Sequence, residues 1–385
     1  MTSIYLDNAA TSFPKPESVH RAYDRTIREI GASPGRGGYG ASIQGARLLY
    51  GVRETVATFF GVSDPSRVIF THGATESINT VLYGMLRGGD RVVTTSMEHN
   101  AVVRPLTHLT SQGVSVTWVN ADRNGVVSLD EFHLAVSRGA RLAVVNGASN
   151  VTGTIQPIAT MAEICRRYGV PFLVDASQMA GTIPIHMERD GIDILAAPAH
   201  KGLLGHPGTG ILILAGDRLP DPLVRGGTGS RSSDPDQPSE LPDRFESGTP
   251  NLPGIASLGA GIDFIRETGI DTIRRHELSL CRQLREGIAS VDGVRVHGPP
   301  DPESAGSVVS FTHDRLDPSL IGARLDHEYG IAVRTGLHCA PLAHRTIGTW
   351  PEGTVRVSPG FFNTADDIDR FVTALSQIVR EGGQI

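Results

Sequence analysis

Residues 192–202 read Ile-Asp-Ile-Leu-Ala-Ala-Pro-Ala-His-Lys-Gly, and a second apolar run, Gly-Ile-Leu-Ile-Leu, follows at 210–214. Both apolar runs are typical of short buried strands, so Lys201 stands beside two strands of the predicted core. Lysine is rarely buried without a reason. On this stretch alone, the more ordinary interpretation is a lysine at a strand end that extends its ammonium group to water. The alternative is a desolvated amine that loses its proton easily and forms a Schiff base with an aldehyde cofactor.

Outward from this stretch, strand patterns alternate with helical patterns. Apolar strand patterns occur at 68–71, 91–95, 114–119, 142–145 and 171–175. This alternation predicts an α/β fold with a mostly parallel sheet and helices on both faces. Ligands of such sheets bind beyond the carboxyl ends of the strands. Ahead of the first of these strands, Ser42 is expected to cap a helix that runs to Phe60.

The pattern changes in the second half of the chain. Residues 226–253 are rich in Gly, Ser, Pro and Asp, which indicates a long loop. Helical patterns near 255–267, 271–290 and 365–380, with strands near 307–312, 331–334 and 354–358, indicate a smaller α+β domain. A length of 385 residues suits two domains. We expect a large domain at 16–253 and a smaller domain made of 1–15 and 254–385.

Composition excludes several classes of protein. A net charge of −6 without a basic tail does not indicate nucleic-acid binding. The N-terminus lacks a secretory signal, and no apolar run approaches the ~20 residues that span a membrane. Three scattered cysteines, Cys165, Cys281 and Cys339, are too few for a disulfide framework or a cysteine-based zinc site. We therefore expect a cytoplasmic protein with no membrane attachment and no metal.

Polar residues follow several of the predicted strands. His72-Gly73-Ala74-Thr75 joins a strand to a helix start, where backbone N–H groups favour an anion such as phosphate. Asp175 ends a strand, and either caps the next helix or waits as a buried anion for a cationic partner. His99, Asn150 and Lys201 follow other strands. Together these residues predict a site for a phosphorylated, nitrogen-containing ring that carries an aldehyde.

The ordered set of motifs resembles the class V aminotransferase family of fold-type I pyridoxal phosphate (PLP) enzymes. Within it, the chain is most similar to the group II, SUF-type cysteine desulfurases and selenocysteine lyases. The motifs are Leu6-Asp7-Asn8-Ala9-Ala10-Thr11, Gly73-Ala74-Thr75-Glu76-Ser77-Ile78-Asn79, Glu98-His99-Asn100, Ser149-Asn150-Val151-Thr152-Gly153, Val174-Asp175-Ala176-Ser177-Gln178, His200-Lys201, Arg244-Phe245-Glu246-Ser247-Gly248-Thr249-Pro250 and Arg334-Thr335-Gly336-Leu337-His338-Cys339-Ala340. They extend over nearly the whole chain.

The resemblance implies a role for each site residue. Lys201 would hold PLP as a Schiff base and then move the substrate Cα proton. Asp175 would pair with the pyridinium nitrogen, which makes the ring an electron sink, and His99 would stack on the ring. The other implied contacts are Asn150 and Gln178 near the ring hydroxyl; Thr75, the Ala74 backbone and His200 at the phosphate; Thr249 at the phosphate of the other subunit; and Arg356, Arg334, Asn8 and Ala9 at the substrate. The contact by Thr249 implies a homodimer with shared active sites.

Cys339 decides which reaction is expected. Cys165 and Cys281 read as buried apolar residues, whereas Cys339 lies in a loop near Arg334 and His338, where cations stabilise a thiolate. The family places its persulfide-forming cysteine at this position. The resemblance therefore implies that L-cysteine becomes L-alanine and that the sulfur passes through a Cys339 persulfide to a protein acceptor. That sulfur would serve iron–sulfur cluster assembly or the synthesis of thio-cofactors or secondary metabolites.

Two alternatives stay open. The first keeps PLP and changes the chemistry to that of a selenocysteine lyase, another C–S lyase or an epimerase-like relative. The second is a sulfur carrier or scaffold that has lost catalysis, against which the presence of Lys201, Asp175 and His99 argues. Two residues also depart from the family pattern. Pro198 replaces the usual Ser or Thr, so a phosphate contact is missing or replaced, and Tyr39 stands where SUF-type enzymes usually have a histidine.

Overall fold

The computed structural model describes residues 4–35 and 37–382. Its largest sheet has seven strands, in the order β2 (Val68–Thr71), β8 (Gly210–Leu214), β7 (Ile194–Pro198), β6 (Phe172–Asp175), β5 (Leu142–Asn146), β3 (Arg91–Thr95) and β4 (Ser115–Val119). Only β8 runs antiparallel to its neighbours in this sheet. The predicted mostly parallel sheet is confirmed, and with it the expected α/β fold class.

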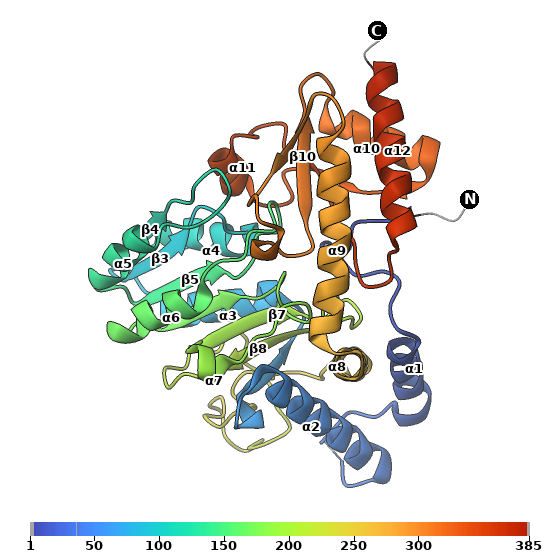
Figure 1. Cartoon of the computed structure of the whole chain (residues 1–385). Coiled ribbons are helices and arrows are strands. Elements are labelled where there is room, and N and C mark those ends of the chain that lie inside the picture. The colour runs from blue at the N-terminus through green and yellow to red at the C-terminus, as the bar shows by residue number, and fades with distance from the viewer. Residues whose placement is uncertain (1–3, 36, 383–385) are drawn as a thin grey trace.

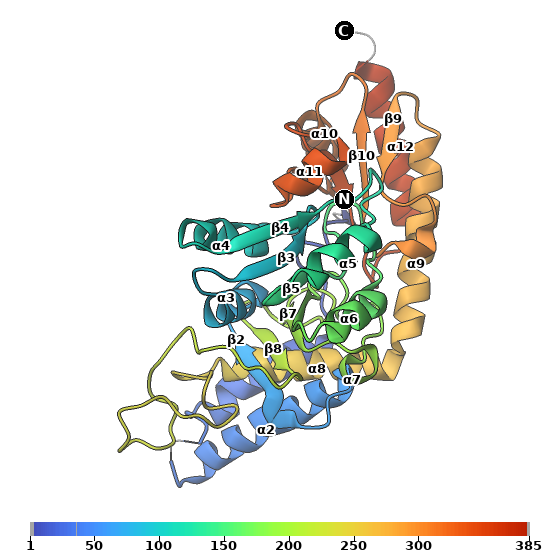
Figure 2. The ribbon, with the colours of Figure 1, turned by 90° about the vertical axis from the view of Figure 1, so that its left-hand side faces the viewer.

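Helices cover both faces of this sheet (Figure 2). One face carries α3 (Ala74–Met85) and α4 (Asn100–Ser111), and the other carries α5 (Leu129–Ser137), α6 (Ile158–Arg167) and α7 (Met187–Asp190). Successive residues of a strand point to opposite faces. In β5, Leu142 and Val144 pack into the core on the α3 and α4 side, and Ala143 and Val145 into the core on the other side. Burial of both faces explains why these strands are continuous apolar runs.

A second, four-stranded antiparallel sheet lies in the upper part of Figure 1. Its order is β12 (Arg334–Gly336), β13 (Thr354–Val357), β10 (Val309–His313) and β9 (Val294–His297). The helices α9 (Ile270–Ala289), α10 (Pro318–Tyr329) and α12 (Ala365–Gly382) share a separate hydrophobic core with it. The short strand β1 (Ile4–Tyr5) pairs in parallel with β11 (Ile331–Ala332). The N-terminal strand is therefore attached to the C-terminal part of the chain.

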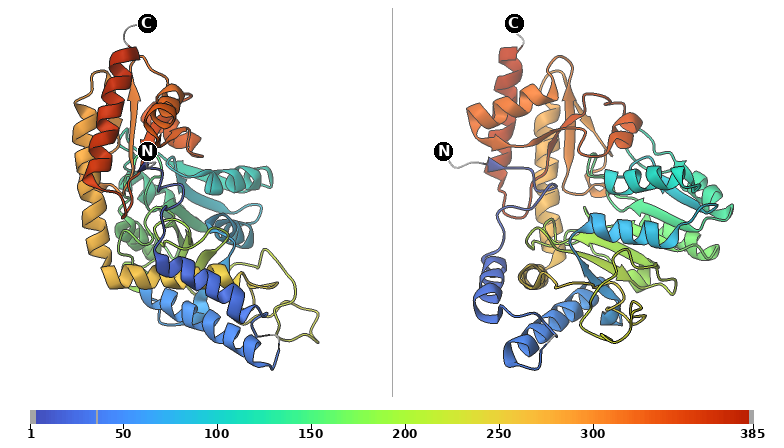
Figure 3. Two further views of the ribbon diagram at one scale, coloured as in Figure 1. Left: turned by 90° about the vertical axis from the view of Figure 1, so that its right-hand side faces the viewer. Right: turned by 180° about the vertical axis from the view of Figure 1, so that it is seen from behind.

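The long helix α8 (Leu252–Thr268) packs against two N-terminal helices, α1 (Glu17–Arg25) and α2 (Gly40–Phe60) (Figure 3). Ile255 and Leu258 of α8 belong to the core of the seven-stranded sheet. The domain boundaries expected from the sequence stay a prediction.

The structure corrects one predicted cap. α2 begins at Gly40 with Tyr39 as its N-cap residue, so the assignment of Ser42 to that position was wrong. Ser42 instead lies in the first turn, where its hydroxyl accepts a hydrogen bond from Gly37 N at 3.1 Å and donates one to Ser33 O at 2.9 Å. A sequence pattern does not reveal this contact, because the hydroxyl serves the preceding loop.

The long loop expected after residue 226 is confirmed, since no helix or strand lies between β8 and α8. In Figure 2 this segment extends away from the body of the molecule, beside the start of α2. Among the described residues, no helix is both long and apolar enough to cross a membrane.

Candidate active site

The carboxyl ends of the parallel strands meet at one edge of the seven-stranded sheet, beside a cavity of about 710 Å³ that we call the large cavity. Eight of the nine residues expected to contact the cofactor, all except Thr249, line it: Ala74, Thr75, His99, Asn150, Asp175, Gln178, His200 and Lys201. Each ends or follows a strand of this sheet in the sequence. The parallel topology therefore gathers residues that are more than 100 positions apart in the chain.

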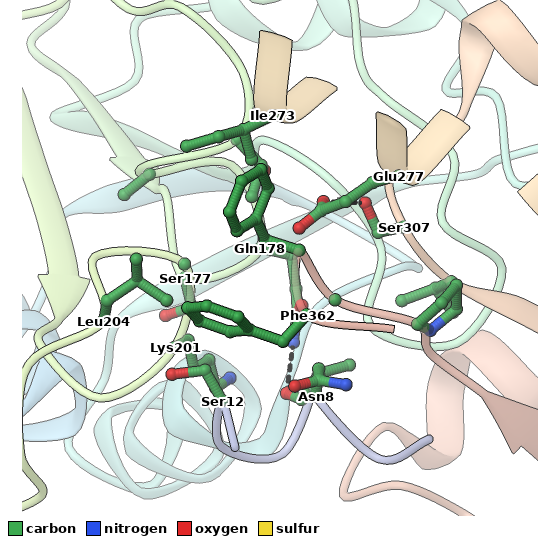
Figure 4. Close-up of a pocket in the computed structure, with 18 of the residues that line it drawn as sticks. Asn8, Ser12, Ser177, Gln178, Lys201, Leu204, Ile273, Glu277, Ser307 and Phe362 are labelled. Carbon is green, nitrogen blue, oxygen red and sulfur yellow. Dashed lines mark hydrogen bonds between the residues drawn. The ribbon is translucent and has the colours of Figure 1, made fainter. Parts of the chain in front are cut away.

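Lys201 lies between two cavities. It lines the large cavity and also a smaller one of about 50 Å³, which Figure 4 shows. Burial lowers the pKa of Lys201 to about 8, and the charges of Arg356 and Arg334 act in the same direction, while Asp175 opposes them. A lysine with this pKa is largely neutral in mildly alkaline solution, as a nucleophilic amine must be.

Asp175 ends β6 and is only 5% exposed. Its Oδ1 accepts a hydrogen bond from Ser177 N at 2.9 Å, in a turn rather than at a helix start, so the alternative of a helix cap is excluded. Within the described residues, no hydrogen bond to its other carboxylate oxygen occurs. That oxygen is available to a cationic group in the large cavity.

The N-terminus of α3 faces the large cavity through Gly73, Ala74 and Thr75. No side chain caps this helix, and its first N–H groups are suited to an anion. A Cβ atom on Gly210 would lie 2.5 Å from Gly73 Cα, so the close approach of β8 to this turn requires glycine. Pro198 lines the same cavity and has neither a hydroxyl nor an N–H to offer an anion.

His200 connects the cavity to the N-terminal segment. Its carbonyl accepts hydrogen bonds from Ser12 N at 3.0 Å, Thr11 Oγ1 at 3.1 Å and Lys15 Nζ at 3.2 Å. Burial lowers the pKa of His200 to about 4, with further contributions from Lys201 and Lys15. The buried Nδ1 atom has no hydrogen-bond partner in the described part of the chain. It is therefore free to contact a ligand.

His99 is the N-cap of α4, where its Nδ1 accepts a hydrogen bond from Ala101 N at 3.0 Å. Burial lowers the pKa of His99, although Asp175 opposes the shift. An acceptor at Nδ1 leaves the proton of the neutral ring on Nε2. The preceding residue, Glu98, is fully buried and accepts from Thr95 Oγ1 at 2.6 Å and Asn146 N at 3.1 Å. Burial raises the pKa of Glu98 to about 8.

Cys339 is the one exposed cysteine, and none of the three cysteines, all of which are described, forms a disulfide. It lies in the loop between β12 and α11 (Pro341–Ile347), as expected, and both His338 and Cys339 have positive φ angles, of 47° and 58°. Such angles are costly for residues other than glycine. Three hydrogen bonds connect this loop to other described segments: Asn100 N to Cys339 O at 2.7 Å, Asn150 Nδ2 to His338 O at 2.7 Å, and His338 Nε2 with Thr354 Oγ1 at 3.0 Å.

Arg356 is 2% exposed and already has partners. Its Nη2 donates to Asp7 Oδ1 at 2.6 Å, and its Nη1 donates to Asn150 O at 3.1 Å. Arg334 is its partner in the register of β12 and β13. Neither arginine is among the residues that line the large cavity. The arginine expected to bind the substrate carboxylate is therefore held by an aspartate in this structure.

The small cavity brings the N-terminal segment against Lys201 (Figure 4). Asn8 and Ala9 line it, and Gln178 Nε2 donates to Ala9 O at 2.9 Å, the dashed line in the figure. On its opposite side lie Glu277 and Ser307. Burial raises the pKa of Glu277 to about 7.

Thr249 and Tyr39 lie apart from the other predicted residues. Thr249 lines a third cavity, of about 540 Å³, and does not line the large one. Tyr39 is 59% exposed at the start of α2. Sequence reasoning gave no role to Asp7 or Glu98, although each stands next to an assigned residue within a quoted motif. Their position beside an assigned residue in the motif was the signal that could have identified them. The expectation that His338 is a cation beside Cys339 was wrong, because burial holds the pKa of His338 far below its ordinary value and the ring is neutral.

Known proteins share this sequence pattern and this fold. The model of the family described as aminotransferase class-V matches residues 4–371. A probable cysteine desulfurase of Methanothermobacter thermautotrophicus is 35% identical, with 98% of this chain and 95% of that protein covered. A probable cysteine desulfurase of Halalkalibacterium halodurans is 32% identical, with 99% and 94% covered. The solved structure of a cysteine desulfurase from Thermococcus onnurineus has a TM-score of 0.92 and 32% identity, with 98% of this chain and 95% of that chain covered.

Proposed function

The chain belongs to the class V aminotransferase family, and we propose that it is a PLP-dependent cysteine desulfurase that converts L-cysteine to L-alanine. The observation that carries this proposal concerns two residues, Lys201 and Cys339. Lys201, with a pKa of about 8, lines the large cavity with Asp175. The carbonyl of the exposed Cys339 accepts a hydrogen bond from Asn100 N, next to His99, which lines the same cavity. The full-length relatives named cysteine desulfurases support the same reaction.

The residues present fit PLP. Lys201 would hold the cofactor covalently, Asp175 offers a carboxylate oxygen for the ring nitrogen, and the start of α3 offers N–H groups for the phosphate. The buried Nδ1 of His200, which has no hydrogen-bond partner among the described residues, adds a polar atom to this site. When bound, PLP supplies an electron sink for the electron pair released at the substrate Cα.

Each remaining step belongs to the chain itself. As a neutral amine, Lys201 would take the Cα proton. The Cys339 thiolate then attacks the substrate sulfur, and a new S–S bond forms as the Cβ–S bond breaks. The electron pair of the broken bond stays on Cβ, which takes up a proton, and Lys201 returns a proton to Cα, so that the products are alanine and a Cys339 persulfide. The hydrogen bond from Asn100 N to Cys339 O fixes the attacking residue relative to His99.

The substrate carboxylate is assigned to Arg356, with Arg334 beside it in the sheet register. Arg356 has a fork geometry that suits a carboxylate, and its Nε is buried without a hydrogen-bond partner among the described residues. We propose that the substrate takes Nη2 from Asp7, while Asn8 and Ala9 form the adjacent wall of the site.

We propose a homodimer in which Thr249 serves the phosphate of the partner. In its own chain Thr249 lines a cavity other than the large one, and Ile43 and Tyr50 of the nearby α2 are 44% and 55% exposed. Mixing Lys201→Ala and Thr249→Ala protomers tests the shared site, because a mixed dimer then contains one complete site. Activity that returns on mixing supports sharing. Failure to return, with mixed dimers demonstrated, contradicts it.

A product assay over a panel of amino acids tests the function. We expect alanine from L-cysteine in a reaction that needs Cys339 and a thiol acceptor. An enzyme that acts on L-selenocysteine and retains full activity as Cys339→Ala would be a selenocysteine lyase instead. The exposed free cysteine suits a reducing compartment such as the cytoplasm, and a cluster-assembly system is the consumer we propose for the sulfur.

A further inference from the structure

Many exposed arginines have no ion pair within the described residues, and three of them lie near the Cys339 loop: Arg104 on α4, Arg123 after β4 and Arg345 on α11. Some other surface arginines are paired, for example Arg324 with Glu328 at 2.6 Å. The chain as a whole carries a net charge of −6. An unneutralised basic patch on an acidic protein is a local feature that needs an explanation.

These arginines surround the Cys339 loop. Asn100 N binds the Cys339 carbonyl at 2.7 Å, and Arg104 lies one helical turn further along α4. α11 starts two residues after Cys339 and buries Ala343 and Ile347, which leaves Arg345 exposed. In Figure 2, α11 lies beside the β4 and α4 edge of the large sheet.

Arg123 joins the same surface from the other side. Its Nη1 lies 3.2 Å from the position of a Cβ on Gly348, the residue that ends α11. Arg345 stacks on the ring of Trp350, 4.7 Å from the ring centroid, and Trp350 is 42% exposed. We call Arg104, Arg123, Arg345 and Trp350 the arginine face.

The chemistry of this face favours one kind of partner. Exposed tryptophan and arginine are the side chains that most often anchor protein interfaces. Two carboxylates lie nearby: Asp122 accepts hydrogen bonds from Asn124 N and Val126 N, and Glu352 follows Trp350 by two residues. Neither forms an ion pair with the arginine face in the described structure, so the face retains its positive charge.

Resting on the proposed function, we propose that the arginine face docks an acidic protein whose own thiol takes the sulfur from Cys339. The acceptor thiolate attacks the terminal sulfur of the persulfide. The bond between the two sulfur atoms breaks, Cys339 leaves as a thiolate, and the new S–S bond lies on the acceptor. One sulfur atom is transferred without an added oxidant or reductant.

Two synthetic peptides of equal length test the proposal, one with a single cysteine among glutamates and the other with a single cysteine among lysines. Sulfur transfer is followed by mass spectrometry of the peptide persulfide after the enzyme receives L-cysteine. We expect the acidic peptide to accept sulfur at least about ten-fold faster at low ionic strength, with the preference falling as salt rises. Equal rates for the two peptides would overturn the proposal.

Variants test whether the arginine face causes the preference for the acidic peptide. The triple variant Arg104→Glu, Arg123→Glu and Arg345→Glu is expected to lose or reverse the preference, and the same three changes to Gln are expected to reduce it. Arg166→Glu on α6, another exposed arginine with no ion pair in the described structure, is the matched control and keeps it. Alanine release with dithiothreitol as acceptor stays unchanged in all of them. Absent alanine release in the natural chain contradicts the proposed function, whereas normal release without a peptide preference contradicts only the docking.

Discussion

Arg356 Nη2 lies 2.6 Å from Asp7 Oδ1, and this ion pair joins residues 349 positions apart. The pair attaches the N-terminal segment to β13 at the point where the substrate carboxylate is proposed to bind. A buried arginine is tolerated only while a partner compensates its charge. The substrate carboxylate can therefore replace Asp7 without leaving Arg356 unpaired.

Asp7→Asn removes the resting partner of Arg356. We expect the free energy of unfolding to fall by about 2–4 kcal/mol, because a buried charge loses its compensation. Urea denaturation of the cofactor-free protein measures this change. Glu17→Gln, which breaks an exposed pair with Arg21, should have little effect. An equal loss of stability in the two variants would show that the buried ion pair contributes no more to stability than the exposed one.

The pKa of Lys201 gives a pH dependence for cofactor uptake. Because burial lowers this pKa to about 8, the neutral amine becomes the major form above pH 8. The rate of covalent PLP attachment should therefore rise through pH 8, as followed by absorbance in the cofactor-free enzyme. Asp175 raises the pKa of Lys201, so Asp175→Asn should move the midpoint to lower pH. A midpoint that moves upward contradicts this assignment.

Glu98 predicts a pH dependence of stability. Its pKa in the folded chain, about 8, lies above its ordinary value of 4.5. Between these values the unfolded chain releases a proton that the folded chain retains, so stability falls by up to about 1.4 kcal/mol per pH unit. Below pH 4.5 and above pH 8 the contribution of Glu98 to stability no longer changes with pH. In Glu98→Gln the slope between pH 5 and 8 should be smaller, because glutamine accepts from Thr95 and Asn146 without titrating. An unchanged slope would mean that other titrating groups, and not Glu98, cause the fall in stability with pH.

Thr354→Val tests how the Cys339 loop is held. The change removes the hydroxyl that bonds His338 Nε2 and keeps the shape of the side chain. Loss of one such hydrogen bond costs about 1 kcal/mol, so the rate of Cys339 persulfide formation should fall roughly five-fold. PLP binding, read from absorbance, should be unaffected because Thr354 does not line the large cavity. A loss of PLP binding together with the loss of persulfide formation would indicate general damage to the fold.

Pro198→Ser restores the residue type usual in the family. Pro198 lines the large cavity beside His200, and a serine there adds a hydroxyl and an N–H. We expect PLP to dissociate up to about ten-fold more slowly, the effect of one additional hydrogen bond to a charged group. Faster dissociation would mean that another residue already fills the place of the missing hydroxyl.

The sequence predicts the large sheet well, because each buried strand is a continuous apolar run that ends at a polar residue. Asp175, Lys201 and His99 could be assigned to one edge since parallel strands share a direction. The hydroxyl of Ser42 was misassigned because it bonds Ser33 and Gly37 of the preceding loop, and local patterns do not report such contacts.

The parts that sequence reasoning missed depend on long-range pairing. Asp7 meets Arg356 because β1 pairs with β11 and an isolated bridge joins Asp7 to Ser358. His338 supports Cys339 through Thr354 of a neighbouring strand and through Asn150 of the large sheet. Neither contact has a periodicity in the sequence, so only the folded chain reveals it.

The most direct test of the account is a single turnover of the PLP-loaded enzyme with L-cysteine, followed by mass spectrometry of the peptide that contains Cys339. We predict one added sulfur atom on Cys339 for each alanine released, no added sulfur on Cys165 or Cys281, and no alanine from Cys339→Ala although its PLP absorbance is retained. Full alanine release from Cys339→Ala, or sulfur on a different cysteine, would contradict the central claim that Cys339 takes the substrate sulfur.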